Sequence, residues 1–350
     1  MSLSAIKEIY LSGDAYSIGY CHGISEGQNI RSFLADNFAQ INLLRYQPLT
    51  KSEILNTVHK HRLIIEEDVP LLAQELLGLA DGAKISYEEA ILLQIRREIV
   101  GQPGMAVSEC SLIAKLEHPD SIIAQTVDLN GRMTDLGSIF RINSTLGTPE
   151  ILMFSFSGLL GYLGMNSSGL GIGINFVSSD GWKVGISPYL IVRHLLQLQS
   201  LEECLQELFR IRRSSSRSFT ICDGSHLAIV EMTPNELKMI KKSKILRTNH
   251  YLHEEFVSLD KMNIFSRNAS KLRLKRLREL VEAENWKLCS EKIFEIFSDH
   301  SLYPIGLCAH SEGNIRKEDT VAAVVLDLNN KKLSIRKGHP CSNPTHEFYL

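Results

Sequence analysis

The sequence predicts an α+β protein in which two groups of antiparallel strands stack between layers of helices. Three features carry this prediction: a helical first third, an abrupt change to short strand-like runs at Cys110, and a second group of such runs after an intervening helical stretch. A parallel sheet is disfavoured because its strands and crossover helices would alternate more regularly. A layered αββα arrangement fits this order of elements best.

The helical part extends from residue 14 to about residue 98. Apolar residues recur every three or four positions in SFLADNFAQINLL and again in ILNTVHKHRLIIEEDVPLLAQELLGLADGA, as on one face of a helix. The segment GQPGMAV then breaks the pattern with glycine and proline. The chain therefore divides into a helical N-terminal segment, residues 1–109, and a strand-rich core, residues 110–350.

Strand-like runs form the two groups beyond this division. The first group, between residues 110 and 178, includes SIIAQTVDL and EILMFSF. One proline-started helix is predicted for residues 188–209, followed by strands SFTICDG, HLAIVEMTP and LKMIKKSK. After a helical stretch at residues 270–286, TVAAVVLDLNNKKLSIRKG predicts a hairpin that turns at Asn329 and Asn330.

The composition excludes some classes of protein. The chain is 44% hydrophobic and 22% charged with a formal net charge of −2, which gives no global attraction to nucleic acid or to an anionic membrane. The longest apolar stretch, ILMFSFSGLLGYLGM, is shorter than the roughly 20 residues of a membrane-spanning helix. No segment near the N-terminus resembles a signal peptide, so we expect a cytoplasmic protein. Seven cysteines without a CxxC pair argue against a disulfide framework and against a zinc site, and we expect no metal or cofactor.

Several motifs with a known mechanism are absent, among them the GxxxxGK[ST] phosphate loop, HExxH and GxSxG. The glycines of GLGIGIN alternate along a strand, which indicates close packing rather than a dinucleotide site. His250 and His253, which would share a helical face, lack a third ligand at a defined spacing, as do His59 and His61. We therefore do not expect either pair to bind a metal.

A basic run, KLRLKRLR at residues 271–278, is followed at once by ELVEAE. This pattern indicates a solvated amphipathic helix. The alternative is a nucleic-acid or membrane surface that uses Arg273, Lys275, Arg276 and Arg278, with strongly salt-dependent binding.

Cys110 is the strongest candidate for a functional residue. It ends the loop GQPGMAVSE and opens an alternating run. A free cysteine often serves only as a small buried hydrophobe, and that packing role is the alternative. As a nucleophile, it needs a base and a donor for the oxyanion. A chain cut just before Cys110 would supply the base, because the new α-amino group has a pKa of about 7.7–8.

Several short segments occur in a fixed order over most of the chain. They are GDAYSIGYCHG, ILLQIRREI, CSLIA followed by AQTVD, GYLGMNSSGLGIGINFV, LRTNHYL, PIGLCAH and TVAAVVLDLNNKKLSIRKGHPC. Together they resemble the acyl-coenzyme A:6-aminopenicillanic acid (isopenicillin N) acyltransferase family of N-terminal-nucleophile cysteine hydrolases. The resemblance implies a four-layer αββα sandwich that is made as an inactive precursor.

The resemblance also implies a self-processing acyltransferase or amidohydrolase. The Cys110 thiol would cut the bond between Glu109 and Cys110, and the chains 1–109 and 110–350 would stay associated. Cys110 would then take an acyl group from an amide or a thioester and pass it to an amine or to water. A coenzyme A thioester is a candidate donor. The expected partners are thus small molecules, with no nucleic acid and no membrane.

The family pattern assigns roles to two further residues. Asn249 is the implied oxyanion donor, although an asparagine before His250 also suits a helix cap. Asp128 is the implied residue that orients the nucleophile and assists cleavage, although it also suits the start of a turn. Secondary candidates for support of the site are Ser111, Gln125, Arg247 and His310. Structural roles are expected for Arg97, His22 and His250.

Three departures from the family pattern bear on activity. Glu109 replaces the usual glycine before the nucleophile, and a bulkier side chain hinders the strained conformation that drives cleavage. Ser111 stands where threonine is common, and Ala309 stands where the family has an arginine. Arg247 or His310 would have to replace that charge. A binding or regulatory protein that keeps the fold uncut is therefore the alternative to an enzyme.

Overall fold

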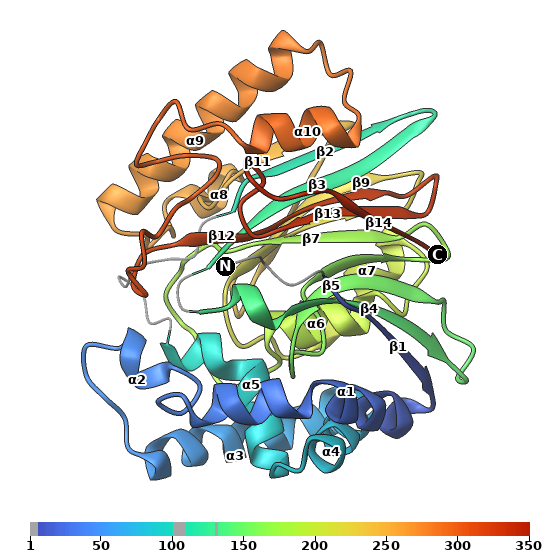
Figure 1. The fold of residues 1–350 in the computed structure, drawn as a ribbon, viewed down its shortest axis with the longest axis vertical. Coiled ribbons are helices and arrows are strands. Elements are labelled where there is room, and N and C mark those ends of the chain that lie inside the picture. The colour runs from blue at the N-terminus through green and yellow to red at the C-terminus, as the bar shows by residue number, and fades with distance from the viewer. Residues whose placement is uncertain (1–5, 101–109, 130–131) are drawn as a thin grey trace.

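The computed structural model describes residues 6–100, 110–129 and 132–350. Within these ranges the chain forms two layers of helices that enclose two stacked sheets (Figure 1). The predicted α+β class and the αββα order of layers are confirmed.

The larger sheet has eight strands in the order β1-β4-β5-β6-β7-β8-β9-β10 within the described ranges. Its strands are β1 (Glu8–Gly13), β4 (Gly137–Ser144), β5 (Ile151–Phe156), β6 (Leu163–Asn166), β7 (Gly171–Asn175), β8 (Arg217–Cys222), β9 (Leu227–Met232) and β10 (Leu237–Lys241). Neighbouring strands are antiparallel except β1 and β4, which run parallel with Ile9 beside Phe140. The segment before Cys110 therefore contributes an edge strand to this sheet.

The smaller sheet has six strands in the order β11-β2-β3-β12-β13-β14, again within the described ranges. Its strands are β11 (Lys244–Arg247), β2 (Leu112–Glu117), β3 (Asp120–Leu129), β12 (Asp319–Asp327), β13 (Lys332–Lys337) and β14 (His346–Tyr349). The predicted hairpin at Asn329 and Asn330 is confirmed, since β12 and β13 pair with Asp327 opposite Lys332.

The N-terminal helices cover the outer face of the larger sheet (Figure 1). They are α1 (Ala15–Ala35), α2 (Ile41–Leu44), α3 (Lys51–Asp68), α4 (Pro70–Ala83) and α5 (Tyr87–Val100). Local signals set their ends: Asp14 accepts the Ser17 N–H at the start of α1, and Thr50 and Glu53 form a capping box at the start of α3. The helical first third is thus confirmed.

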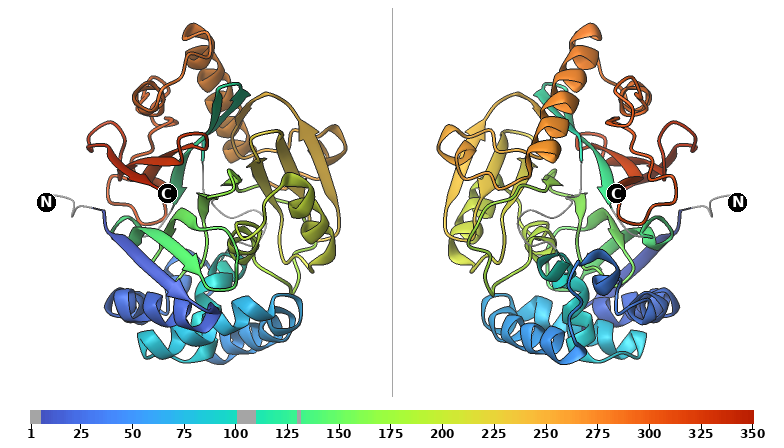
Figure 2. Two further views of the ribbon diagram at one scale, coloured as in Figure 1. Left: turned by 90° about the vertical axis from the view of Figure 1, so that its right-hand side faces the viewer. Right: turned by 90° about the vertical axis from the view of Figure 1, so that its left-hand side faces the viewer.

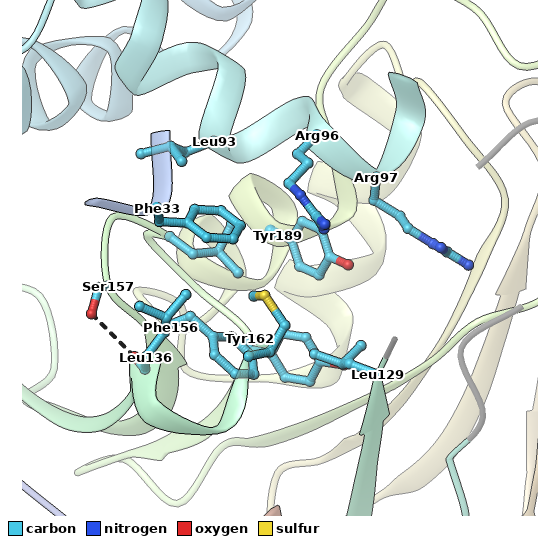
Figure 3. A pocket seen from close by; sticks show the side chains of 12 residues that line it. Phe33, Leu93, Arg96, Arg97, Leu129, Leu136, Phe156, Ser157, Tyr162 and Tyr189 are labelled. Atoms are coloured by element: carbon cyan, nitrogen blue, oxygen red, sulfur yellow. Dashed lines mark hydrogen bonds between the residues drawn. The ribbon is translucent and has the colours of Figure 1, made fainter. Parts of the chain in front are cut away.

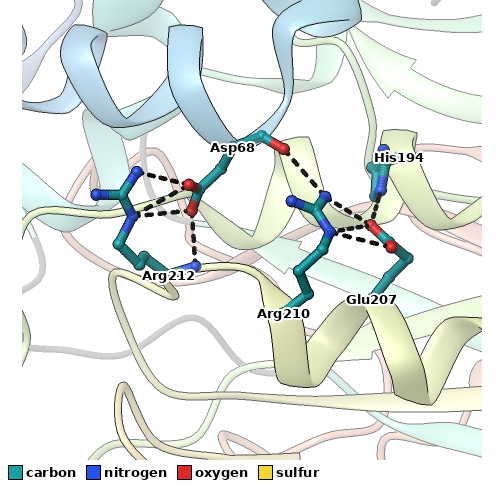
Figure 4. Close-up of polar contacts among 5 residues, drawn as sticks. All are labelled: Asp68, His194, Glu207, Arg210 and Arg212. Carbon is teal, nitrogen blue, oxygen red and sulfur yellow. Dashed lines mark hydrogen bonds and ion pairs between the residues drawn. The ribbon is translucent and has the colours of Figure 1, made fainter.

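Residues 188–209, predicted as one helix, form two: α6 (Pro188–Leu195) and α7 (Leu201–Arg210). The prediction was wrong because Ser200 accepts the Glu203 N–H and starts a new helix. Polar contacts then attach α7 to the N-terminal layer (Figure 4): Arg210 binds Glu207 and the Asp68 carbonyl, and Arg212 binds the Asp68 carboxylate.

The C-terminal helices cover the outer face of the smaller sheet, at the opposite end of the molecule from α1–α5 (Figure 2). They are α9 (Ile264–Ala283) and α10 (Ser290–Phe297); the short α8 (Glu254–Val257) packs instead through Phe256 against Val177 and Tyr251. Leu277 of α9 and Phe294 of α10 pack against Ile113 of β2 in one apolar cluster. None of the helices in the described ranges has the length and apolarity that a bilayer crossing requires.

The two sheets approach closely at the glycines of β7. A Cβ atom added at Gly173 would lie 2.6 Å from Leu112 Cδ1 of the opposite sheet, and one at Gly171 would lie 2.6 Å from Leu328 Cδ2. The prediction that GLGIGIN serves close packing is therefore confirmed. The same contact places the end of β7 beside the start of β2, where Cys110 lies.

Candidate active site

Cys110 lies just before β2, between the two sheets, with 2% of its surface exposed. Its position is fixed by pairing with β3, because the Ser111 carbonyl accepts the Thr126 N–H at 2.9 Å and Thr126 Oγ1 accepts the Ser111 N–H at 2.9 Å. Glu109, and with it the predicted cleavage bond, lies outside the described residues. Of the two residues that this bond joins, the structure describes only Cys110, on the C-terminal side.

The backbone of Cys110 is held by three side chains from different elements. Its N–H donates to Asn249 Oδ1 at 2.9 Å, and its carbonyl oxygen accepts from Arg273 Nη1 at 3.2 Å and from Asn175 Nδ2 at 3.4 Å. Arg273 Nη2 also donates to Asn249 Oδ1 at 3.0 Å. Because a guanidinium only donates, this contact fixes which end of the Asn249 amide faces the Cys110 nitrogen.

The buried Asp128 lies on β3, close enough to Cys110 to act on its thiol. Its Oδ1 accepts from Thr320 Oγ1 at 2.6 Å and its Oδ2 accepts from Thr126 Oγ1 at 3.1 Å. Since Thr126 also binds the Ser111 N–H, a continuous set of hydrogen bonds joins Asp128 to the residue after the candidate nucleophile. Gln125 joins the sheets nearby, because its side-chain oxygen accepts the Ile174 N–H at 2.9 Å.

The thiol of Cys110 is protonated at neutral pH in this environment. Burial raises the pKa of Cys110 to about 12, and the Asp128 carboxylate acts in the same direction. A hydrogen bond from the Asp128 backbone, the Arg273 charge and a hydrogen bond from Gln125 oppose the rise. Formation of the thiolate therefore requires a base close to the sulfur.

A small cavity opens at Cys110. Its walls are aromatic and aliphatic apart from one cation, and besides Cys110 they are Tyr162, Ile174, Phe176, Tyr189 and Arg217. The Arg217 guanidinium lies 4.8 Å from the centre of the Phe176 ring, and that of Arg97 lies 4.7 Å from the same centre. The cavity thus combines an apolar wall with positive charge.

A second pocket shares Tyr162 and Tyr189 with this cavity (Figure 3). Its lining is mainly apolar: Phe33, Leu93, Leu129, Met133, Leu136, Phe156 and Leu159, with Arg96, Arg97 and Ser157. Arg96 and Arg97 extend from α5 and line one side of the pocket (Figure 3). Arg96 Nη2 and Arg97 Nε are buried and have no hydrogen-bond partner among the described residues.

Comparison with known proteins places the chain among acyltransferases. The sequence model of the acyl-coenzyme A:6-aminopenicillanic acid acyl-transferase family matches residues 120–341, more than half of the chain. The chain belongs to this family. It is therefore an enzyme of the acyltransferase and amidohydrolase class. The match begins after Cys110, so the role of Cys110 does not follow from it.

Two curated relatives of this acyltransferase family member align over nearly their whole length. The 40 kDa form of acyl-coenzyme A:6-aminopenicillanic-acid-acyltransferase from Emericella nidulans is 24% identical over 344 residues, covering 97% of this chain and 94% of the relative. The β-alanyl-dopamine/carcinine hydrolase of Drosophila melanogaster is 23% identical over 382 residues, covering 98% and 95%.

Two solved structures are similar over 69% of the chain. Penicillin V acylase from Agrobacterium tumefaciens has 12% identity and a TM-score of 0.45, with 86% of that chain covered. A variant of conjugated bile acid hydrolase from Clostridium perfringens has 14% identity and a TM-score of 0.46, with 97% covered.

The structure brings five of the predicted site residues of this family member together: Cys110, Ser111, Gln125, Asp128 and Asn249. Two others lie elsewhere. Arg247 is buried in an ion pair with Glu231, and His310 lies beside His300, so neither lines the Cys110 cavity.

Arg273 is a contact of Cys110 that the sequence interpretation missed. The prediction of a solvated basic helix was wrong for this residue, because its side chain is fully buried while Arg276 on the same helix is partly exposed. A signal was present: Arg273 shares a helical face with Ser270 and Leu277, three and four residues away, and both are buried.

The expected framework histidines are confirmed as such. Buried His22 accepts the Gly158 N–H through Nε2 at 3.0 Å, and His250 Nδ1 lies 2.8 Å from Ser270 Oγ. The shared helical face suggested for His250 and His253 is wrong, since α8 begins only at Glu254.

Proposed function

We propose that this chain is a self-processing cysteine N-terminal-nucleophile enzyme that forms an acyl-enzyme on Cys110. The acyl donor is an amide or a thioester, and the acceptor is an amine or water. The observation that carries the proposal is the contact of the Cys110 backbone nitrogen with Asn249 Oδ1 at 2.9 Å, beside a buried thiol that lacks an attached base.

The base in this proposal is the α-amino group that cleavage before Cys110 would create. The pKa of such a group is about 7.7–8, close to working pH, so a substantial fraction of the amine is neutral and can accept the thiol proton as the sulfur attacks. Asn249 Oδ1 would accept one amine hydrogen and keep the nitrogen where the amide nitrogen now lies. Arg273, bound to the same oxygen, would favour the thiolate by its charge.

The proposed reaction has two halves. The Cys110 sulfur attacks the carbonyl carbon of the donor, the bond from that carbon to the leaving nitrogen or sulfur breaks, and the leaving group takes the proton from the α-ammonium. An amine or water then attacks the thioester, gives its proton to the α-amine, and releases the sulfur. The backbone N–H of Asp128 and a hydrogen of Asn249 Nδ2 are the donors proposed for the oxyanion.

The precursor would be cut by the same sulfur. In this step the Cys110 sulfur attacks the Glu109 carbonyl carbon and the peptide C–N bond breaks, which leaves a thioester and a free α-amine that has taken the thiol proton. Water then hydrolyses the thioester and frees the Cys110 thiol and a carboxylate on Glu109. Asp128 is proposed to assist, because its carboxylate is anchored by Thr126 and Thr320 beside Cys110.

The pockets support an apolar acyl group. The second pocket is continuous in its lining with the Cys110 cavity through Tyr162 and Tyr189, and its remaining walls are largely aliphatic and aromatic. The unpartnered nitrogens of Arg96 and Arg97 would suit an anionic part of the donor, which keeps a coenzyme A thioester among the candidates.

The test is the intact mass of the purified protein under denaturing conditions, compared with Cys110→Ala. We expect two fragments in the wild type, 1–109 and 110–350, and one chain in the variant. Cys204→Ala, at another buried cysteine, is the control and should be cut like the wild type. An uncut wild type would overturn the proposal and favour a binding protein that keeps the fold, in line with Glu109 and Ala309.

A further inference from the structure

Two histidines and two cysteines meet near the C-terminus, away from the Cys110 cavity. His300, Cys308 and His310 come from the segment after α10, and Cys341 follows β13. One ligand atom from each of the four side chains lies within 4.8 Å of every other. This cluster, His300–Cys308–His310–Cys341, has the donor set of a closed Cys₂His₂ site.

The distances agree with four ligands around one small ion. Cys308 Sγ lies 3.8 Å from Cys341 Sγ and 3.4 Å from His310 Nε2, and Cys341 Sγ lies 3.7 Å from His310 Nε2. With Zn–S near 2.3 Å and Zn–N near 2.1 Å, tetrahedral geometry requires about 3.8 Å between sulfurs and about 3.6 Å between sulfur and nitrogen.

We propose that this cluster binds one zinc ion. Thiolate and imidazole together favour zinc over magnesium or calcium, which prefer oxygen. The two nitrogens, His300 Nε2 and His310 Nε2, are 2.9 Å apart and would separate to about 3.4 Å around the metal. His300 is exposed, so this movement meets little resistance.

A disulfide is the competing use of the same cysteines. The two sulfurs are 3.8 Å apart, well beyond the bonded distance of about 2.05 Å, and His310 Nε2 lies close to both of them. A disulfide leaves the convergence of His300 and His310 on the sulfurs without a role. A metal uses all four side chains.

The zinc would fix a segment next to the candidate active site. Ala309, between two of the ligands, donates its N–H to Thr320 Oγ1 at 2.8 Å and accepts the Thr320 N–H at 3.0 Å. Thr320 Oγ1 donates in turn to Asp128 Oδ1 at 2.6 Å. The ion is therefore structural in this proposal: it holds Thr320, and through it Asp128, without touching substrate.

The sequence did not suggest this site because its ligands have no usual zinc spacing. Only Cys308 and His310 are close in sequence, and Cys341 comes from a separate part of the chain. The expectation of no metal rested on the absence of a CxxC pair. In the proposed site the fold, rather than close spacing in sequence, brings the four ligands together.

The test is elemental analysis of the full chain, produced without a histidine tag and dialysed against metal-free buffer. We expect about one zinc per chain in the wild type and less than about 0.2 in Cys308→Ser and Cys341→Ser. Cys289→Ser removes an exposed cysteine outside the cluster and should keep the metal. Replacement by Co²⁺ should give the visible bands of a tetrahedral thiolate site.

His300→Gln keeps the test valid if the cysteine variants misfold, because His300 is exposed and its replacement should leave the fold intact. In competition with a chelator this variant should bind zinc at least about tenfold more weakly than the wild type. The proposal is overturned by a wild type that takes up no zinc when reduced and supplied with it. It is also overturned by a Cys308–Cys341 disulfide in freshly purified protein, or by equal zinc content in all variants.

Discussion

Replacing Arg273 with methionine tests whether this arginine prepares Cys110 for reaction. The buried guanidinium donates to the Cys110 carbonyl oxygen at 3.2 Å, to Ser111 Oγ at 3.1 Å and to Asn249 Oδ1 at 3.0 Å. Methionine also has a long, unbranched side chain, but it has neither the charge nor the donors. Removal of the charge raises the free energy of the thiolate, and removal of the donors releases the Asn249 amide.

The magnitude follows from the position of the charge. Because the guanidinium contacts the carbonyl oxygen of Cys110 itself, we take its distance from the Cys110 sulfur as about 6 Å for an order-of-magnitude estimate. At an effective dielectric constant of about 20, this separation corresponds to about 3 kcal/mol, or about 2 pKa units. Relaxation and solvent reduce the effect, so we expect the pKa of the Cys110 thiol to rise by about one to two units. Since only the thiolate reacts, alkylation at fixed pH should slow by about 10- to 100-fold.

The assay is alkylation by iodoacetamide at about pH 8, with Cys110 followed by peptide mass. Arg276→Met is the matched control, because Arg276 lies on the same helix, pairs with Asp299 and is 28% exposed. Arg273→Lys keeps the charge, so its rate of Cys110 alkylation should fall less than that of Arg273→Met. Circular dichroism checks that all variants fold. Alkylation of Arg273→Met within about threefold of Arg276→Met would refute the reasoning, since that difference is below 1 kcal/mol.

Three further predictions concern packing, cleavage and pH. Gly173→Ala should lower the free energy of unfolding by about 1–3 kcal/mol, because the new Cβ lies 2.6 Å from Leu112 Cδ1; an unchanged urea midpoint would contradict this. Asp128→Asn keeps the shape that binds Thr320 but removes the charge, so cleavage before Cys110 should slow at least about tenfold in an intact-mass time course, and an unchanged rate would argue against assistance by Asp128. Burial lowers the pKa of His22 from 6.5 to about 4, so as the pH falls the unfolded state takes up a proton at higher pH than the folded state does. The stability from neutral His22 is therefore complete above pH 6.5 and is lost towards pH 4, by about 2 kcal/mol between pH 7 and pH 5. His22→Gln should flatten the pH dependence measured by urea unfolding, and an equal slope would count against this assignment.

The layers of the fold could be predicted because their signals are local. Helical periodicity marks residues 14–98, and alternation with a turn signal marks the β12–β13 hairpin. Strands of four residues, such as β6 and β11, carry too few residues for such a pattern, and pairing with their neighbours forms them. The break between α6 and α7 depends on the cap formed by Ser200, which competes with an apolar pattern that continues across it.

The candidate site could be predicted only where residues act near their place in sequence. Cys110 immediately precedes β2, Asp128 lies on the adjacent strand β3, and the family pattern supplied Asn249. Arg273 was missed because a run of basic residues hides the helical phase that buries one of them. Asn175 was missed because its contact with Cys110 arises only when the two sheets stack.

The parallel pairing of β1 with β4 bears on the order of biosynthesis. β1 precedes Cys110 in the chain and β4 follows it, so β1 leaves the ribosome without this partner and stays unpaired with it until the segment around Phe140 emerges. Once the pair forms, the bond before Cys110 belongs to a closed loop whose two ends share one sheet. A cut in that loop would therefore not release the first 109 residues, and the two pieces would part only when the sheet itself unfolds.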